Sequence, residues 1–200
     1  MWTTLFDGTR VTGWRMSTIR NQPGYDDPGR FELTDGALVS RPGSDLGLYW
    51  YTRPAPRDYE LVLEFRQRAL ADNSGVHVRF PDPDSKGYNN TAYVAVDFGF
   101  EVQIDGVGAP DGAPKHRTGA IYNIDDQALT LAAARPPGEW NELAIVAVGQ
   151  VYTVRLNGRQ TTRFENANVA RGTSQPAFVG LQAHPGEGAV GFRNIRIRAL

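Results

Sequence analysis

A short run of alternating residues at positions 100–105 carries the groups best able to do chemistry in this chain. On a β-strand, alternate side chains point to opposite faces, so Glu101, Gln103 and Asp105 would share one face while the apolar residues between them enter a core. Neighbouring acids repel one another and strands disfavour them, so this row adds little stability. The row therefore indicates a polar ligand, and a solvated strand face is the alternative.

Two other segments repeat this pattern of polar and apolar residues. His77 and Arg79 alternate with valines in Gly-Val-His-Val-Arg-Phe, and Gln182 and His184 alternate with apolar residues in Leu-Gln-Ala-His. If the three strands are neighbours, one concave face gathers all of these groups. A surface or hydrogen-bonded histidine is commoner than a catalytic one. His77 and His184 are candidates for a site only because other polar side chains are expected on the same face.

Tyr122 is the aromatic residue that we expect to face the same pocket. It ends the segment Thr-Gly-Ala-Ile-Tyr, directly after a loop that carries His116 and Arg117. Trp14 and Trp140 are instead assigned to structure, because large aromatic side chains supply much of the buried area of β folds.

A divalent metal ion is a possible cofactor with weak support. His184 with Glu101 or Asp105 could bind one, but no His-Glu-x-x-His or EF-hand spacing occurs. The acidic pairs Asp82/Asp84 and Asp125/Asp126 would suit calcium and are more typical of ordinary turns. The sequence also lacks a glycine-rich phosphate loop before a helix and a Gly-x-Ser-x-Gly elbow, which argues against nucleotide and serine-hydrolase chemistry.

The composition restricts which partners and which cellular compartments we expect for this chain. Lys+Arg 21 against Asp+Glu 22 gives a net charge of -1, which favours neither nucleic acid nor an anionic membrane as partner. The absence of cysteine excludes disulfides and thiolate chemistry. The longest apolar run, 143–148, is too short to cross a bilayer, and the first residues lack a basic flank followed by an apolar stretch. We therefore expect a soluble, cytoplasmic protein.

Short β-branched segments separated by 22 glycines and 13 prolines predict an all-β fold in one domain, 1–200. About a dozen strands need two packed sheets, so we predict a two-sheet jelly-roll sandwich. Asn157-Gly158 and Gly149-Gln150 predict two-residue hairpin turns. The predicted strands are 30–33, 37–41, 48–51, 59–68, 75–80, 99–105, 119–122, 140–148, 151–156, 159–164, 178–183 and 190–197.

Four segments are too long to be hairpin turns, and loops of this length are often functional. They are 17–29, 81–93, 106–117 and 125–138. The residues in them that could wall a pocket are Tyr88, Asn89, Asn90, Tyr93, His116 and Arg117.

An ordered set of short phrases resembles the bacterial 3-keto-disaccharide hydrolase domain family, formerly a domain of unknown function. The resemblance spans essentially the whole chain, and it implies a concanavalin A-like (laminin G-like) jelly roll. The phrases are Leu-Phe-Asp-Gly-Thr at 5–9, Gly-Trp at 13–14, Asn-Ser-Gly-Val at 73–76 with Arg79, Phe-Glu-Val-Gln-Ile-Asp at 100–105, Thr-Gly-Ala-Ile-Tyr at 118–122, Gly-Glu-Trp-Asn at 138–141, Leu-Asn-Gly at 156–158, Leu-Gln-Ala-His at 181–184 and Phe-Arg-Asn-Ile-Arg at 192–196.

The resemblance implies that sugars oxidised at C3 are the substrates. A C3 ketone acidifies the C2 proton, so a base can remove this proton, the C1 substituent can leave by elimination, and water can then add. On this reading the base is Glu101, Asp105 or His184. The enolate oxygen would be stabilised by Arg79, Gln103, Tyr122 or a metal, and His77 and Gln182 would also contact the substrate. The chain differs from the family pattern at His77 and in a longer loop, 81–97.

Two alternatives remain. A lectin-like module would bind carbohydrate without chemistry, because this fold serves both purposes. The residues at 101–105 also resemble the Glu-x-Asp-x-Glu strand of jelly-roll endoglucanases, with Gln103 in the middle position. Retaining hydrolysis of that kind needs two carboxyl groups about 5 to 5.5 Å apart.

Overall fold

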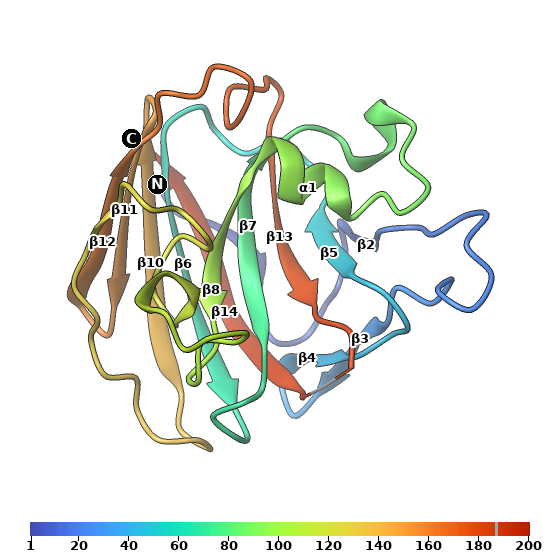
Figure 1. The fold of residues 1–200 in the computed structure, drawn as a ribbon, viewed down its shortest axis with the longest axis horizontal. Helices are drawn as coiled ribbons and strands as arrows, with labels where there is room; N and C mark the ends of the chain where they lie inside the picture. Colours follow the sequence, from blue (N-terminus) through green and yellow to red (C-terminus); the bar gives the residue numbers. More distant parts are fainter. Residues whose placement is uncertain (187) are drawn as a thin grey trace.

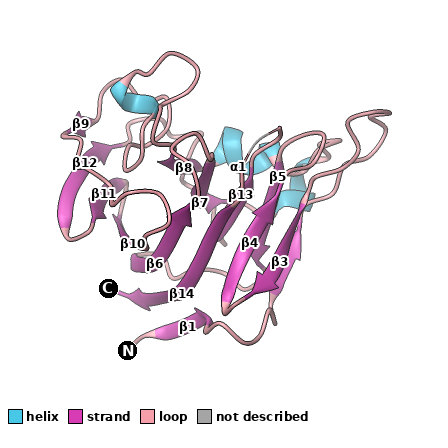
Figure 2. Ribbon diagram, turned by 90° about the horizontal axis from the view of Figure 1, so that it is seen from below, coloured by secondary structure: helices cyan, strands magenta, loops and turns pink. Residues whose placement is uncertain are grey.

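Two antiparallel β-sheets packed face to face form the body of the computed structural model, which describes residues 1–186 and 188–200 (Figures 1 and 2). The larger sheet has the strand order β3 (Arg30–Thr34), β4 (Ala37–Arg41), β14 (Val190–Ala199), β6 (Tyr59–Gln67), β10 (Asn141–Val148), β11 (Val151–Leu156), β12 (Arg159–Glu165) and β9 (Ala128–Leu129), and β1 (Thr3–Phe6) also pairs with β14. The smaller sheet has the order β2 (Trp14–Met16), β5 (Gly47–Tyr51), β13 (Phe178–Ala183), β7 (Ser74–Phe80) and β8 (Phe100–Ile104). The predicted jelly-roll sandwich is confirmed.

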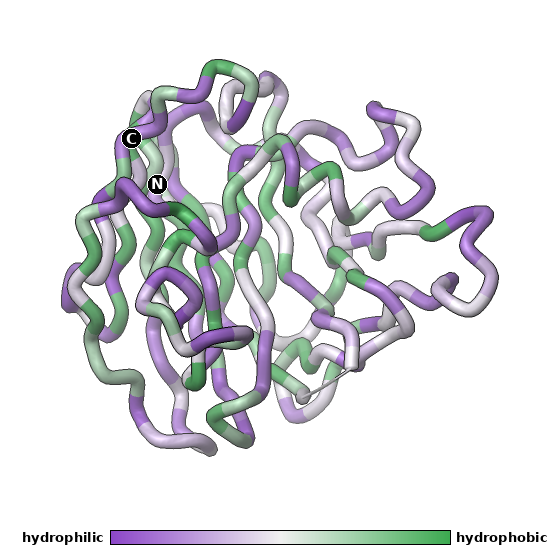
Figure 3. The backbone as a smooth tube through the Cα atoms, in the orientation of Figure 1, coloured by the Kyte–Doolittle hydropathy of each residue, from purple (hydrophilic) through white to green (hydrophobic). Residues whose placement is uncertain are grey.

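The core lies between the sheets, where each strand places every second residue. Val76, Val102 and Leu181 of the smaller sheet and Leu63 and Phe65 of the larger belong to one buried cluster. Burial of such side chains contributes about 1.5–3 kcal/mol each. The projecting loops are mostly hydrophilic (Figure 3). The face of the smaller sheet that points away from this core is therefore the face that carries the polar rows.

Most predicted strands form with ends within one or two residues of expectation. The segment 119–122 is not a strand: Ile121 makes only an isolated bridge to Val102. Strands β1, β2 and β9 were not predicted, because they have two to four residues and too little alternation. The Asn157-Gly158 turn has φ angles of 50° and 79°, as a hairpin turn with two positive φ angles requires.

The sequence pattern did not predict the helix α1 (Tyr93–Phe98), which follows the 3-10 turn η1 (Pro83–Lys86) within the long loop between β7 and β8. The helix has only 6 residues, its N-cap has no side-chain hydrogen bond, and it contains β-branched residues. Packing stabilises it instead, because Ala92 and Ala95 lie against Phe80, Phe178 and Trp50 of the smaller sheet. In Figure 2 the helices lie on the side of the smaller sheet that faces away from the larger one.

The two tryptophans assigned to structure occupy different environments. The Trp14 Nε1 donates to the Leu5 carbonyl oxygen at 2.8 Å, and its ring stacks on Tyr49 in the core cluster. Trp140 is half-buried on the outer face of the larger sheet, between the guanidinium groups of Arg66 and Arg193 at 4.6 and 4.1 Å from its ring centroid. Trp140 is therefore stabilised by cation–π contacts rather than by the core.

No helix in the described part of the chain is long and apolar enough to span a membrane. A second 3-10 turn, η2 (Pro114–His116), lies in the loop after β8.

Candidate functional site

The strand order brings the three polar rows together. β13, β7 and β8 are consecutive in the smaller sheet, with His77 paired with Glu101 and Gly75 paired with Gln103. Since Val102 and Ile104 enter the core, Glu101 and Gln103 point to the opposite face, as the alternation predicts. A cavity of about 470 Å³ lies over this face. Its lining residues are Leu46, Asn73, Tyr93, Val96, Glu101, Gln103, Ala109, Pro110, Tyr122, Gln182, His184 and Pro185.

Glu101 is the carboxyl group of this cavity, and it is 8% exposed. Burial raises its pKa to about 8, although a hydrogen bond with Gln182 and the positive charge of Arg171 act in the opposite direction. With the Gln103 amide nitrogen turned toward its acceptors, Gln103 donates to Glu101 Oε1 and to the Ser74 carbonyl oxygen, both at 3.1 Å. Two amides thus fix a carboxyl group whose pKa lies close to neutral pH, as general acid–base chemistry requires.

Gly75 makes room for the Glu101 side chain. A Cβ atom at Gly75 would lie 2.6 Å from Cγ of Glu101, closer than any real contact. The glycine of the Asn73-Ser74-Gly75 phrase is therefore required by the catalytic candidate itself rather than by backbone conformation.

His77 does not reach the cavity. It is 1% exposed on β7, with α1 packed against this strand, and its Nε2 lies 3.8 Å from Oε2 of Glu101. Burial and, secondarily, the Arg171 charge lower its pKa to about 3, so the imidazole is neutral beside the carboxyl group. The structure thus places His77 behind Glu101, where direct contact with a substrate is not available to it.

Arg79 departs from the predicted face because β7 has a bulge at this position. Its φ is 59°, and the register with β13 shifts between Phe178 and Val179. The side chain therefore points between the sheets, over the rings of Tyr59 and Tyr152 and 3.4 Å from Asp58. Arg79 is not among the residues that line the cavity.

Asp105 is also placed outside the cavity, although it follows Glu101 and Gln103 on the same side. It is fully buried, and its Oδ1 accepts from the backbone N–H groups of Val107 and Gly108 while Oδ2 accepts from that of Ala109, at 2.8–2.9 Å. Asn73 Nδ2 also approaches Oδ2 at 3.4 Å. Asp105 thus organises the turn that carries Ala109 and Pro110 into the cavity wall.

Tyr122 lies at the edge beyond β8, where its N–H donates to the Glu101 carbonyl oxygen at 2.8 Å. Its ring packs on His116 with centroids 5.0 Å apart, and His116 Nδ1 lies 2.7 Å from Asp111 Oδ1. Burial and then the negative charge of Glu101 raise the pKa of Tyr122. The phenol therefore remains a hydrogen-bond donor near neutral pH.

Five residues of the predicted site line one cavity: Glu101, Gln103 and Gln182 from strands, His184 just after β13, and Tyr122 from the loop after β8. Among the loop residues expected in the wall, only Tyr93 lines it. Asn90 is buried, and its side chain donates to Asp45 and to the Leu46 carbonyl oxygen.

Arg171 helps to position the segment around Glu101, and the sequence did not predict this role. Its guanidinium donates to the Gly99 and Val96 carbonyl oxygens at 2.6 and 3.0 Å and lies 4.5 Å from the Phe100 ring centroid. It thereby fixes the end of α1 and the start of β8, beside Glu101. It is 70 residues from Glu101 along the chain, and no local sequence pattern predicts that contact.

Metal ligation by the predicted residues finds little support in the geometry. Within residues 1–186 and 188–200, no three His, Asp or Glu side chains gather as a metal site would require. Of the pair proposed with His184, Asp105 is saturated by backbone donors. The possible divalent metal stays a prediction.

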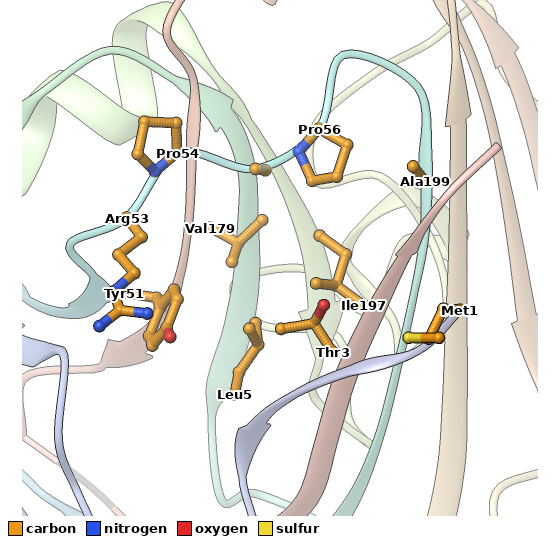
Figure 4. A pocket seen from close by; sticks show the side chains of 11 residues that line it. Met1, Thr3, Leu5, Tyr51, Arg53, Pro54, Pro56, Val179, Ile197 and Ala199 are labelled. Carbon is orange, nitrogen blue, oxygen red and sulfur yellow. The ribbon is translucent and has the colours of Figure 1, made fainter.

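A second cavity, of about 270 Å³, opens beside the N-terminal strand between the two sheets (Figure 4). Leu5, Val179 and Ile197 project into it, with Pro54 and Pro56 at its rim. The described residues that line it include no carboxylate or imidazole, so it offers no acid–base chemistry.

A family model for the 3-keto-alpha-glucoside-1,2-lyase-like domain matches residues 1–198. The chain belongs to this family. The family relation agrees with the resemblance drawn from the sequence phrases.

Solved structures show the same fold. Two proteins of Parabacteroides distasonis ATCC 8503, each described as a "putative glycosyl hydrolase", superpose with TM-scores of 0.75 and 0.74 at 19% and 24% identity; all of this chain is covered in both, with 94% and 100% of theirs. The carbohydrate-binding module CBM66 of Bacillus subtilis superposes with a TM-score of 0.55 at 12% identity, over 92% of this chain and 95% of its own. A search of curated proteins finds no match. At these identities the likeness establishes the fold.

Proposed function

We propose that this protein cleaves glycosides oxidised at C3 by β-elimination, with Glu101 as the base. Glu101 removes the C2 proton, the electron pair forms the C1–C2 double bond, and the C1–O bond breaks with protonation of the departing oxygen. The C3 carbonyl makes the proton acidic, so a carboxylate of raised pKa suffices as base. The observation that carries the proposal is a single buried, amide-held carboxyl group in a cavity of a 3-keto-glycoside lyase-like domain.

The polar residues around Glu101 suit the remaining tasks. The phenol of Tyr122 would donate to the enolate oxygen. Arg79 was also expected to stabilise this oxygen, but the bulge of β7 turns its side chain away from the cavity. His184 would protonate the departing oxygen. In the described part of the chain, Asn73 Oδ1 and Gln182 Oε1 are buried acceptors that receive no hydrogen bond, and sugar hydroxyls would satisfy them.

Ordinary retaining hydrolysis has less support. Glu101 and Asp105 are four residues apart on an extended segment, which separates their Cα atoms by about 13 Å. Asp105 is also fully occupied by the turn that follows it. The pair therefore does not provide the separation of about 5 to 5.5 Å that this mechanism uses.

A lectin-like function is the second candidate. It is favoured by the amides of Asn73, Gln103 and Gln182, which could bind hydroxyl groups without any chemistry, and by the fold shared with a carbohydrate-binding module.

The deciding experiment is incubation of the protein with a panel of 3-keto glucosides and the matched unoxidised glucosides, with and without a chelator. Elimination predicts release of the C1 substituent from the 3-keto compounds alone, and retention of activity with chelator would favour protein groups over a metal. Binding of both series without release of product would support the lectin instead.

A further inference from the structure

The lining of the cavity changes character across the sheet. Glu101 and Gln103 stand on β8, whereas Leu46 directly precedes β5. The order β5-β13-β7-β8 puts three strand spacings, roughly 14 Å, between these edges. A cavity of this breadth has room for a sugar ring over the polar edge and a second ring over the other.

The second edge of the cavity is formed by the loop between β7 and β8, which contains α1. Tyr93 and Val96 of this helix line the cavity beside Leu46. Tyr93 is 39% exposed, and Leu46 belongs to the apolar cluster under the helix, against which Val96 packs. The long loop between β7 and β8 therefore supplies an apolar wall.

The polar atoms of this wall are already bonded to one another. The Tyr93 hydroxyl donates to Asp45 Oδ1 at 3.0 Å, and Asn90 Nδ2 donates to Asp45 Oδ2 at 3.0 Å. The Leu46 N–H also donates to Asp45 Oδ1. These bonds hold the Tyr93 ring in place and leave its face, rather than its hydroxyl, for a ligand.

We infer that the group released from C1 is an aromatic aglycone, bound against Tyr93, Val96 and Leu46. The hydroxyl groups of a sugar in this position would lose their hydrogen bonds to water and would find few free hydrogen-bonding groups on this wall. Each buried hydroxyl left without a partner is costly in binding free energy. An aromatic ring would bury apolar area and stack on Tyr93 without that cost. The inference rests on the proposed function, because that function puts the glycosidic bond beside Glu101.

The test compares benzyl and methyl 3-keto-glucosides, whose leaving alcohols have similar acidity. We expect the parent to bind and turn over the benzyl compound preferentially, and Tyr93→Ala to reduce this preference by about 3- to 10-fold, the range of one aromatic stack. Tyr93→Phe keeps the ring and should keep the preference. Tyr25→Ala, at a tyrosine 64% exposed and away from the cavity, is the matched control.

Affinity measured by calorimetry on Glu101→Gln separates this inference from the proposed function. A benzyl preference in binding that depends on Tyr93 supports the apolar subsite even if the parent releases no alcohol, in which case only the elimination chemistry is wrong. Turnover of both compounds with equal kcat/KM and equal affinity, unchanged in Tyr93→Ala, overturns the subsite and leaves the elimination intact.

Discussion

Glu101 combines the two properties that a base for the proposed elimination needs, an enclosed position and a pKa of about 8. Its alternation with Val102 was visible in the sequence, but its pKa was not, because burial depends on Gly75, α1 and the loop after β8. The neighbouring His77 is neutral, so it adds no positive charge that would lower the pKa of Glu101. The pKa of Glu101 is thus set by residues outside its own strand.

The pH dependence should follow the titration of Glu101. The base form accumulates as pH rises, so kcat/KM for a 3-keto glucoside should increase through about pH 8. Stability should change oppositely. The folded state holds the proton that the unfolded chain releases near 4.5, so this contribution is complete below pH 4.5 and lost as pH rises through about 8. Chemical denaturation from pH 4 to 9 should show a smaller loss in Glu101→Gln than in the parent; equal slopes would contradict a raised pKa.

Gly75→Ala should displace Glu101 while leaving the strand intact. The added methyl group would overlap the Glu101 side chain, and a shift of about 1 Å in a catalytic group costs on the order of 10²-fold in rate. The expected result is a loss in kcat with a modest change in melting temperature. Gly191→Ala on β14, where a Cβ would meet no atom closer than 3.5 Å, is the matched glycine control for effects on the fold. Full activity in Gly75→Ala would show that the position of Glu101 is not critical.

At the scale of elements, the site depends on the bulge of β7, on the face that β8 presents to the cavity, and on the turn that follows β8. The strand pattern predicted the face of Glu101, Gln103 and Gln182, since period-two alternation is a local property. It was wrong for Arg79, because a bulge reverses the side chain and no residue in the sequence marks it. It was incomplete for Asp105, where the strand ends and the carboxylate bonds to its own turn. The α1 wall was missed because tertiary packing stabilises that helix.

Asp105→Ala should therefore act through the turn rather than through proton transfer. Three backbone N–H groups lose their acceptor, which should cost about 1–3 kcal/mol in the free energy of unfolding. Activity should fall partially, because Ala109 and Pro110 lose their fixed place in the wall. Urea denaturation and kcat/KM check both; an unchanged stability with abolished turnover would return Asp105 to the chemistry.

At the scale of the whole molecule, the sandwich holds the site by packing the reverse face of its strands. Ile104 is fully buried between the sheets on the same strand as Glu101, whereas Val148 is 46% exposed on β10. Composition and strand count predicted two sheets, because one open sheet would leave an apolar face in water. The order of strands was beyond sequence reasoning, since it depends on pairings between distant segments.

Ile104→Ala should destabilise the protein by about 2–5 kcal/mol, and Val148→Ala by much less, because only the first leaves a cavity in the core. Thermal and urea unfolding measure the difference. Equal losses would mean that the two faces of β8 are assigned wrongly, and the site on the other face would be wrong with them.

The most direct test of the elimination is a 3-keto glucoside labelled with deuterium at C2. Abstraction by Glu101 predicts loss of the label from the product, a primary isotope effect on kcat/KM, and a fall in turnover of about 10²- to 10⁴-fold in Glu101→Gln with binding retained. A product that keeps its C2 deuterium, formed at the same rate as from the unlabelled compound, would contradict the account.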